Sequence, residues 1–280
     1  MKKQIWLPAL AWVGGIAGFA LRRWEWNTAY DSVTRLMSTT LAGGLLTALM
    51  IVLAVAFILG CRGVGRRSAA DWFYAPSGGY AMAALSGALV MLLGGGFGLR
   101  QLYAGGERNM MSLAAFLLLI VGGATAAVLA REIYRGIWSA KATPIMLMLP
   151  SFGALFWLVC VYQQHARQPE VQLYAWQLLS AVAIVLALYG QVTLSLDKGG
   201  AGRTCVYGLL AIALTPAALA DGADFAHSLV WLGSAVWLTA QSYMLLNAAF
   251  GPERPERMCP PEEAEQPEEE TELEDTDNGQ

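Results

Sequence analysis

The sequence predicts an all-α protein, a polytopic transmembrane helical bundle with eight spans. Eight stretches of 17 or more residues contain no Asp, Glu, Lys or Arg, and short charged segments separate them. About 20 apolar residues at 1.5 Å per residue cross a hydrocarbon core of roughly 30 Å, and only a helix satisfies its own backbone there. Charged residues make up 14% of the chain, too few to cover the core of a soluble protein of 280 residues.

The first span, residues 5–21, follows two lysines and resembles a secretory signal. Because Arg22 and Arg23 come directly after it and no good small-residue cleavage site precedes them, we expect an uncleaved signal anchor. The next five spans are long uncharged segments. We place them at about residues 39–60, 79–99, 110–130, 144–163 and 172–195.

The seventh span, residues 204–220, has two possible paths. Its uncharged run is only 17 residues long and holds Pro216, so a re-entrant or broken segment is the alternative. The eighth span, residues 227–249, ends before Gly251-Pro252, which stops a helix. Together the spans form one transmembrane domain, residues 1–250.

The basic residues predict an N-in/C-in orientation. With the N-terminus inside, twelve Lys and Arg residues fall in inner segments and six in outer ones, in agreement with the positive-inside rule. Aromatic residues recur near the expected membrane edges, with Trp72 at an inner edge and Trp24 at an outer one.

The formal net charge of −3 conceals an uneven distribution. Ten of the 21 acidic residues fall in Glu262–Asp277, and residues 1–260 alone carry a net charge of +7. Residues 251–280 also contain several prolines, so we expect a disordered acidic tail on the cytoplasmic side. Either the tail is only a solvated end, or it docks a basic cytoplasmic protein.

The segment after the first span carries three arginines on the expected outer side, against the orientation rule. Arginine presents a planar fork suited to phosphate and carboxylate, which predicts an anion or lipid-headgroup site. The alternative is interfacial anchoring with an arginine paired to an acidic residue. The site residues that we assign here are Arg22, Arg23, Trp24, Trp26 and Arg35.

The middles of the spans hold neutral polar residues and no charge, which disfavours ion coupling. Four of these residues could line a polar cavity or, alternatively, could bridge helices by hydrogen bonds. They are Gln177, Gln191, Thr215 and Gln241. Glycines and prolines inside spans could form hinges. The hinge candidates are Gly94, Gly95, Gly96, Gly98, Pro150 and Pro216.

Small residues recur four positions apart, as at Gly14 and Gly18, and this spacing lets helix backbones approach closely. Such a face packs helices within one chain or joins a homo-oligomer. The two histidines and four cysteines show no metal-binding spacing, so we expect neither a metal nor another cofactor. Ser86 and His227 resemble the serine and histidine motifs of rhomboid proteases, but we expect them at different membrane depths. Nothing indicates a nucleic-acid partner.

In hydropathy and layout, residues 1–250 resemble the many uncharacterised multi-spanning membrane proteins of bacteria. The resemblance implies a multi-pass protein of the cell membrane, in contact with the lipid bilayer, and no particular chemistry. Uncharged spans and short loops favour a non-enzymatic accessory, sensory or scaffold component. The alternatives are a small-solute transporter or permease subunit and, less favoured because convergent catalytic residues are absent, an intramembrane enzyme.

Overall fold

A computed structural model describes residues 3–30, 38, 40–65, 67–75, 77–105, 109–165 and 173–251 of the chain. Eight helices in these residues are long and apolar enough to cross a membrane, which confirms the predicted all-α polytopic bundle. They are α1 (Lys3–Ala29), α2 (Leu41–Gly60), α4 (Gly78–Gly105), α5 (Met110–Tyr134), α6 (Ala142–His165), α7 (Ala175–Ser195), α8 (Ala201–Leu219) and α9 (Phe225–Phe250). A short helix, α3 (Ala69–Trp72), precedes α4.

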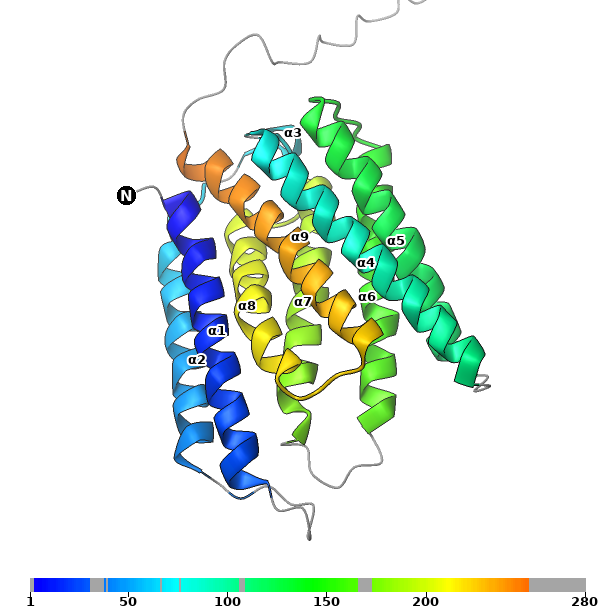
Figure 1. The fold of residues 1–280 in the computed structure, drawn as a ribbon. Helices are drawn as coiled ribbons and strands as arrows, with labels where there is room; N and C mark the ends of the chain where they lie inside the picture. The colour runs from blue at the N-terminus through cyan, green and yellow to red at the C-terminus, as the bar shows by residue number, and fades with distance from the viewer. Residues whose placement is uncertain are drawn as a thin grey trace, which may run out of the picture.

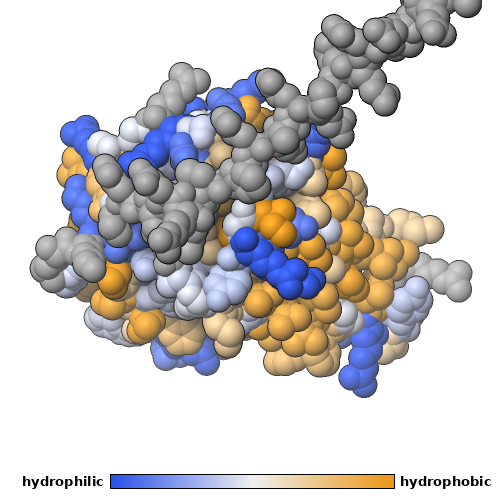
Figure 2. Space-filling view, turned by 90° about the horizontal axis from the view of Figure 1, so that it is seen from above, coloured by the Kyte–Doolittle hydropathy of each residue, from blue (hydrophilic) through white to orange (hydrophobic). Residues whose placement is uncertain are grey.

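The long helices run back and forth between two faces of the bundle (Figure 1). The start of α1 and the end of α9 lie at the same face, where the Lys3 ammonium lies 4.8 Å from the centre of the Phe250 ring. We call this the terminal face and the other the distal face. In Figure 2, seen onto the terminal face, hydrophobic residues form the flanks of the bundle. Which face is cytoplasmic stays a prediction.

Helix α9 forms the centre of the bundle. It packs against α1, α3, α4, α7 and α8, and 72% of the residues in its apolar window are buried, compared with 28% for α2. The lipid-facing side of α2 explains its uniformly apolar sequence, because hydrocarbon solvates every side chain there. The core therefore lies along α8 and α9, and α2 stands at its edge.

Helices α4 and α9 approach each other closely through glycines. A Cβ atom added at Gly87 would lie 2.5 Å from the backbone nitrogen of Trp237, and one at Gly233 would lie 2.6 Å from that of Met91. Gly14 and Gly18 likewise face Leu53 and Met50 of α2. These small residues pack helices of one chain together. Homo-oligomerisation stays a prediction.

The helices differ from the predicted spans in several places, of which three bear on the site and the packing. α1 continues to Ala29, eight residues beyond its expected end, so the first arginines are helical and not in a loop. α3 was not expected, and Trp72, predicted at the membrane edge, is buried. α8 runs unbroken through Pro216, where the ring packs against Gly15 of α1, and the broken-segment alternative is therefore not observed. Of the predicted tail, residues 251–280, all but Gly251 lie outside the described residues.

Candidate functional site

A buried arginine near the distal face organises the candidate site. The side chain of Arg22 is 1% exposed, and its Nε donates to Asp221 Oδ1 at 2.6 Å. Its other nitrogens donate to Glu25 Oε2 at 2.8 Å and to the backbone oxygen of Leu173 at 3.1 Å. The indole of Trp26 donates to the same Asp221 oxygen at 2.9 Å. The Arg22 guanidinium thus connects α1 to the segment before α7 and to the turn between α8 and α9.

Local sequence explains how these groups meet. Arg22, Glu25 and Trp26 are three and four positions apart on α1 and therefore share one helix face. Asp221 lies in a tight turn in which Gly222 adopts a φ of +77°, a conformation that most other residues avoid. Since α1 packs along α8, this turn brings Asp221 to the charged face of α1.

Burial dominates the electrostatics of Asp221. It raises the pKa of this carboxyl above the ordinary value, and the nearby Arg22 and Trp26 lower the pKa by a smaller amount. The second carboxylate oxygen, Oδ2, is buried and has no hydrogen-bond partner among the described residues. The guanidinium, in contrast, is engaged by two carboxylates, so it offers little attraction to a further anion.

A groove opens beside this cluster, between α2 and α7. No Cα atom of α2 lies within 8 Å of a Cα atom of α7. The cavity has a volume of about 750 Å³. We call it the α2–α7 groove, and its lining comprises Arg22, Glu25, Ser38, Thr40, Gly43, Gly44, Thr47, Ala48, Ile51, Ala175, Trp176 and Leu179.

The groove is polar at one end and apolar along its length. Arg22, Glu25 and Thr40 form the polar end near the distal face, whereas Ile51 and Leu179 expose apolar surface further in. Thr40 and Ile51 are eleven positions apart on α2, a rise of about 16 Å, which is roughly half of a 30 Å hydrocarbon core. The groove therefore extends across about one leaflet.

Two further residues of the predicted anion or headgroup site, Arg23 and Trp24, take no part in the charged cluster. Both are exposed on α1, and Arg35 lies outside the described residues. The sequence interpretation missed Asp221, the α2 residues and Trp176. Nothing local to Asp221 indicates that it pairs with an arginine 199 positions away.

The four residues of the predicted polar cavity are all buried. Thr215 lies 3.3 Å from the Ser180 hydroxyl, and Gln241 donates to the Tyr80 hydroxyl at 3.2 Å. Of the four main cavities among the described residues, only a small one near the distal face includes Gln177. None includes Gln191, Thr215 or Gln241. The geometry thus favours helix bridging for Thr215 and Gln241, and the transport alternative stays a prediction.

The predicted hinge residues lie inside continuous helices. Gly94 faces Ala226 and Val230 of α9, and Pro150 of α6 faces Gly122 of α5. Gly95 and Gly98 face α5, whereas a Cβ added at Gly96 would meet nothing within 4 Å. These positions allow close packing in the structure, and hinge motion there stays a prediction.

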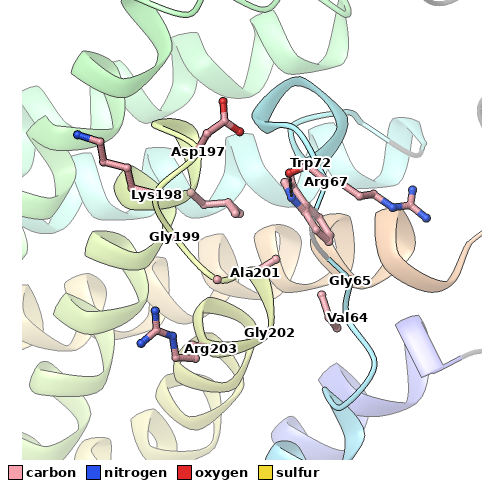
Figure 3. Close-up of a pocket in the computed structure, with 12 residues that line it drawn as sticks. Val64, Gly65, Arg67, Trp72, Asp197, Lys198, Gly199, Ala201, Gly202 and Arg203 are labelled. Carbon is pink, nitrogen blue, oxygen red and sulfur yellow. Dashed lines mark hydrogen bonds between the residues drawn. The ribbon is translucent and has the colours of Figure 1, made fainter.

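A second cavity, of about 420 Å³, lies at the terminal face between α3 and the turn from α7 to α8. Its lining includes Arg67, Lys198 and Arg203, yet Figure 3 shows these three side chains pointing away from one another. Asp197 uses its carboxylate to accept a hydrogen bond from the backbone nitrogen of Ala69, at 2.6 Å. The basic groups therefore do not converge on a common ligand position.

The serine and histidine that resemble rhomboid motifs do not form a catalytic pair. Ser86 is exposed on α4 and donates to Ala83 of its own helix. His227 is buried on α9, and its Nδ1 accepts a hydrogen bond from Trp157. In the described residues no group of three or more His, Cys, Asp or Glu is placed to hold a metal ion.

Comparison of the chain with protein-family models, curated proteins and solved structures found no match.

Proposed function

We propose that this protein is a non-enzymatic membrane component, accessory or sensory in role, that binds a membrane lipid in the α2–α7 groove. The observation that carries the proposal is the polarity of the groove. Charged and hydroxyl groups lie at the distal end, and apolar side chains extend from there across about one leaflet. This arrangement matches an amphiphile with its headgroup at the membrane edge and an acyl chain in the hydrocarbon.

The polar end of the groove does not require a negatively charged headgroup. Arg22 is neutralised by Glu25 and Asp221, so the cluster as a whole is not cationic. Trp176 lies at the same end, where an indole ring suits the headgroup region. The proposal keeps the headgroup interpretation of this segment and gives less weight to the anion interpretation.

Photocrosslinking can test the proposal on the full chain. A phospholipid with a diazirine on its acyl chain is added to the protein in nanodiscs, and crosslinked peptides are mapped by mass spectrometry. We expect crosslinks concentrated on the groove segment of α2, residues 44–51, and at Leu179. Gly44→Phe should remove them, because a side chain at Gly44 meets nothing within 4 Å and would fill the groove without a clash.

Gly96→Phe on α4 is the matched control. A side chain there also meets nothing within 4 Å, and the position is remote from the groove. The groove crosslinks should persist in this variant. If Gly44→Phe leaves them unchanged, or if labelling is no stronger at the groove than on the other lipid-facing helices, the lipid site is wrong.

A further inference from the structure

Two cysteine thiols meet at the terminal face, where α2 ends and α8 begins (Figure 1), and the proposed function uses neither of them. Cys61 directly follows α2, and Cys205 lies near the start of α8. Both are buried, and their side chains are hydrogen-bonded to each other. The backbone agrees with this contact, because a Cβ atom added at Gly202, one turn before Cys205, would lie 3.5 Å from the carbonyl oxygen of Cys61. The fold thus brings together two thiols that are far apart in the sequence.

The surroundings of the two thiols give them different reactivity. Cys205 is 1% exposed, and its sulfur also lies 4.0 Å from the backbone oxygen of Ser242, so this thiol is a donor between two acceptors. The hydrogen bond from Cys205 lowers the pKa of the Cys61 thiol, burial opposes this effect, and the nearby Lys3 ammonium lowers the pKa further. Since the thiolate is the reactive form of cysteine, Cys61 is the nucleophile of the pair.

A cavity between the end of α2 and the start of α8 brings small molecules to Cys61. It has a volume of about 360 Å³. We call it the α2–α8 cavity, and its lining comprises Ile58, Cys61, Arg62, Gly202, Arg203, Val206 and Tyr207. Cys61 belongs to this lining, whereas Cys205 does not. A reactant that enters the cavity therefore meets the more reactive thiol first, and the second thiol lies in contact behind it.

We propose that Cys61 and Cys205 are a site of reversible oxidation, at which hydrogen peroxide converts the two thiols into a disulfide. The Cys61 thiolate attacks one peroxide oxygen and the O–O bond breaks, so that Cys61 becomes a sulfenic acid. The other oxygen leaves as hydroxide and becomes water with the proton that the Cys61 thiol released. The sulfur of Cys205 then attacks the sulfur of Cys61, the S–S bond forms and the S–O bond breaks. The departing hydroxide takes the proton of Cys205, so two thiols and one peroxide give one disulfide and two waters.

The position of Cys61 suits this chemistry. A thiol in contact with a sulfenic acid directs it to a disulfide before further oxidation. Cys61 caps the end of α2, so only the turn there has to adjust for the sulfurs to reach a bond length of about 2 Å. On the cytoplasmic side, where the sequence predicts the terminal face, thiols are kept reduced, and the pair therefore rests as a dithiol until peroxide reaches it. The site does not depend on the lipid in the α2–α7 groove.

Peptide mapping under non-reducing conditions tests the proposal on the full-length protein in nanodiscs. The reduced protein is treated with hydrogen peroxide, the remaining free thiols are alkylated with iodoacetamide, and the proteolytic peptides are identified by mass spectrometry. We expect a pair of peptides joined through Cys61 and Cys205, which dithiothreitol separates again. Cys160→Ser is the matched control, because Cys160 is also a buried free thiol but lies on α6. This variant should form the linked pair as the wild type does.

Cys205→Ser separates a reactive pair from two thiols that only pack together. It is made together with Cys259→Ser, so that the thiol of the C-terminal segment cannot take the place of Cys205. Cys61 should then stop at the sulfenic acid, which dimedone traps, and the label at Cys61 should exceed that at Cys160 about tenfold or more. The proposal is overturned if peroxide leaves Cys61 and Cys205 as free thiols in the wild type, if either is joined to another cysteine instead, or if dimedone labels Cys61 and Cys160 equally.

Discussion

Replacing Arg22 by methionine should destabilise the fold strongly, because the change leaves two carboxylates without their cation. The side chain of Asp221 is 1% exposed and that of Glu25 is 13% exposed, so water cannot replace the guanidinium. Breaking a buried ion pair by removal of one partner typically costs about 3–5 kcal/mol. Burial already raises the pKa of Asp221, so proton uptake limits the cost and we expect the lower end. A loss of about 3 kcal/mol raises the unfolding constant by more than 100-fold.

A double-mutant cycle with Asp221→Asn separates the ion pair from general packing. Once Arg22 is absent, an uncharged amide at position 221 no longer buries an unpaired charge. The double variant should therefore be more stable than the sum of the two single losses predicts, by at least about 1.5 kcal/mol.

Reversible unfolding in mixed detergent micelles, followed by tryptophan fluorescence, gives the required free energies. Arg23→Met is the matched control, because Arg23 is the next residue on α1 and is exposed. It should lose less than about 0.5 kcal/mol. Equal losses for Arg22→Met and Arg23→Met, or strictly additive losses in the cycle, would refute the role given to the buried pair.

Three further predictions follow from single contacts. Because burial raises the pKa of Asp221 above 3.8, the stabilising contribution of this carboxyl is full below pH 3.8 and is lost as the pH rises through the folded-state pKa. The difference in unfolding free energy between wild type and Asp221→Asn should therefore fall as the pH rises across this range. A difference that does not change with pH would contradict this prediction. Gly87→Ala should lower the free energy of unfolding by about 1–3 kcal/mol in the same assay, because the added methyl group would clash with the backbone of α9. Gly96→Ala is the control and should lower it by nothing, because a methyl group there meets no atom within 4 Å. Equal effects of the two variants would argue against close backbone contact between α4 and α9. Tyr80→Phe should lower the free energy of unfolding by about 0.6–2 kcal/mol, since Gln241 would lose its only hydrogen-bond partner among the described residues. An unchanged free energy of unfolding would show that the Gln241 amide finds another partner.

The helices could be predicted from the sequence because the signal is local. An uncharged run of about 20 residues needs no knowledge of its neighbours to become a membrane helix. The candidate site could not be predicted in the same way. The charge of Arg22 predicts that the first span ends before it, yet this charge is neutralised inside the bundle by Asp221, 199 positions away. Which carboxylate meets which arginine depends on α1 lying beside α8.

Aromatic and glycine residues illustrate the same limit. The position of Trp72 predicts a place at the membrane edge, which nothing in the structure tests, whereas its burial and the hydrogen bond from its indole to the backbone oxygen of Arg67 depend on α3. The dense glycines of α4 indicated local flexibility, whereas Gly94 and Gly95 lie against two different helices. In each case composition identifies the unusual position, and only the packing shows what the residue contacts.

The position of α1 has a consequence for how the protein is made. Besides α2, the neighbours of α1 are α8 and α9, which are translated long after it. During synthesis α1 and α2 must therefore stay in the bilayer as a pair, with Arg22 not yet joined to Asp221. Assembly of the centre waits until α9 has entered the membrane, because α4 and α8 also pack on it. A chain that ends before Phe225 would therefore lack the helix on which α1, α4 and α8 all pack.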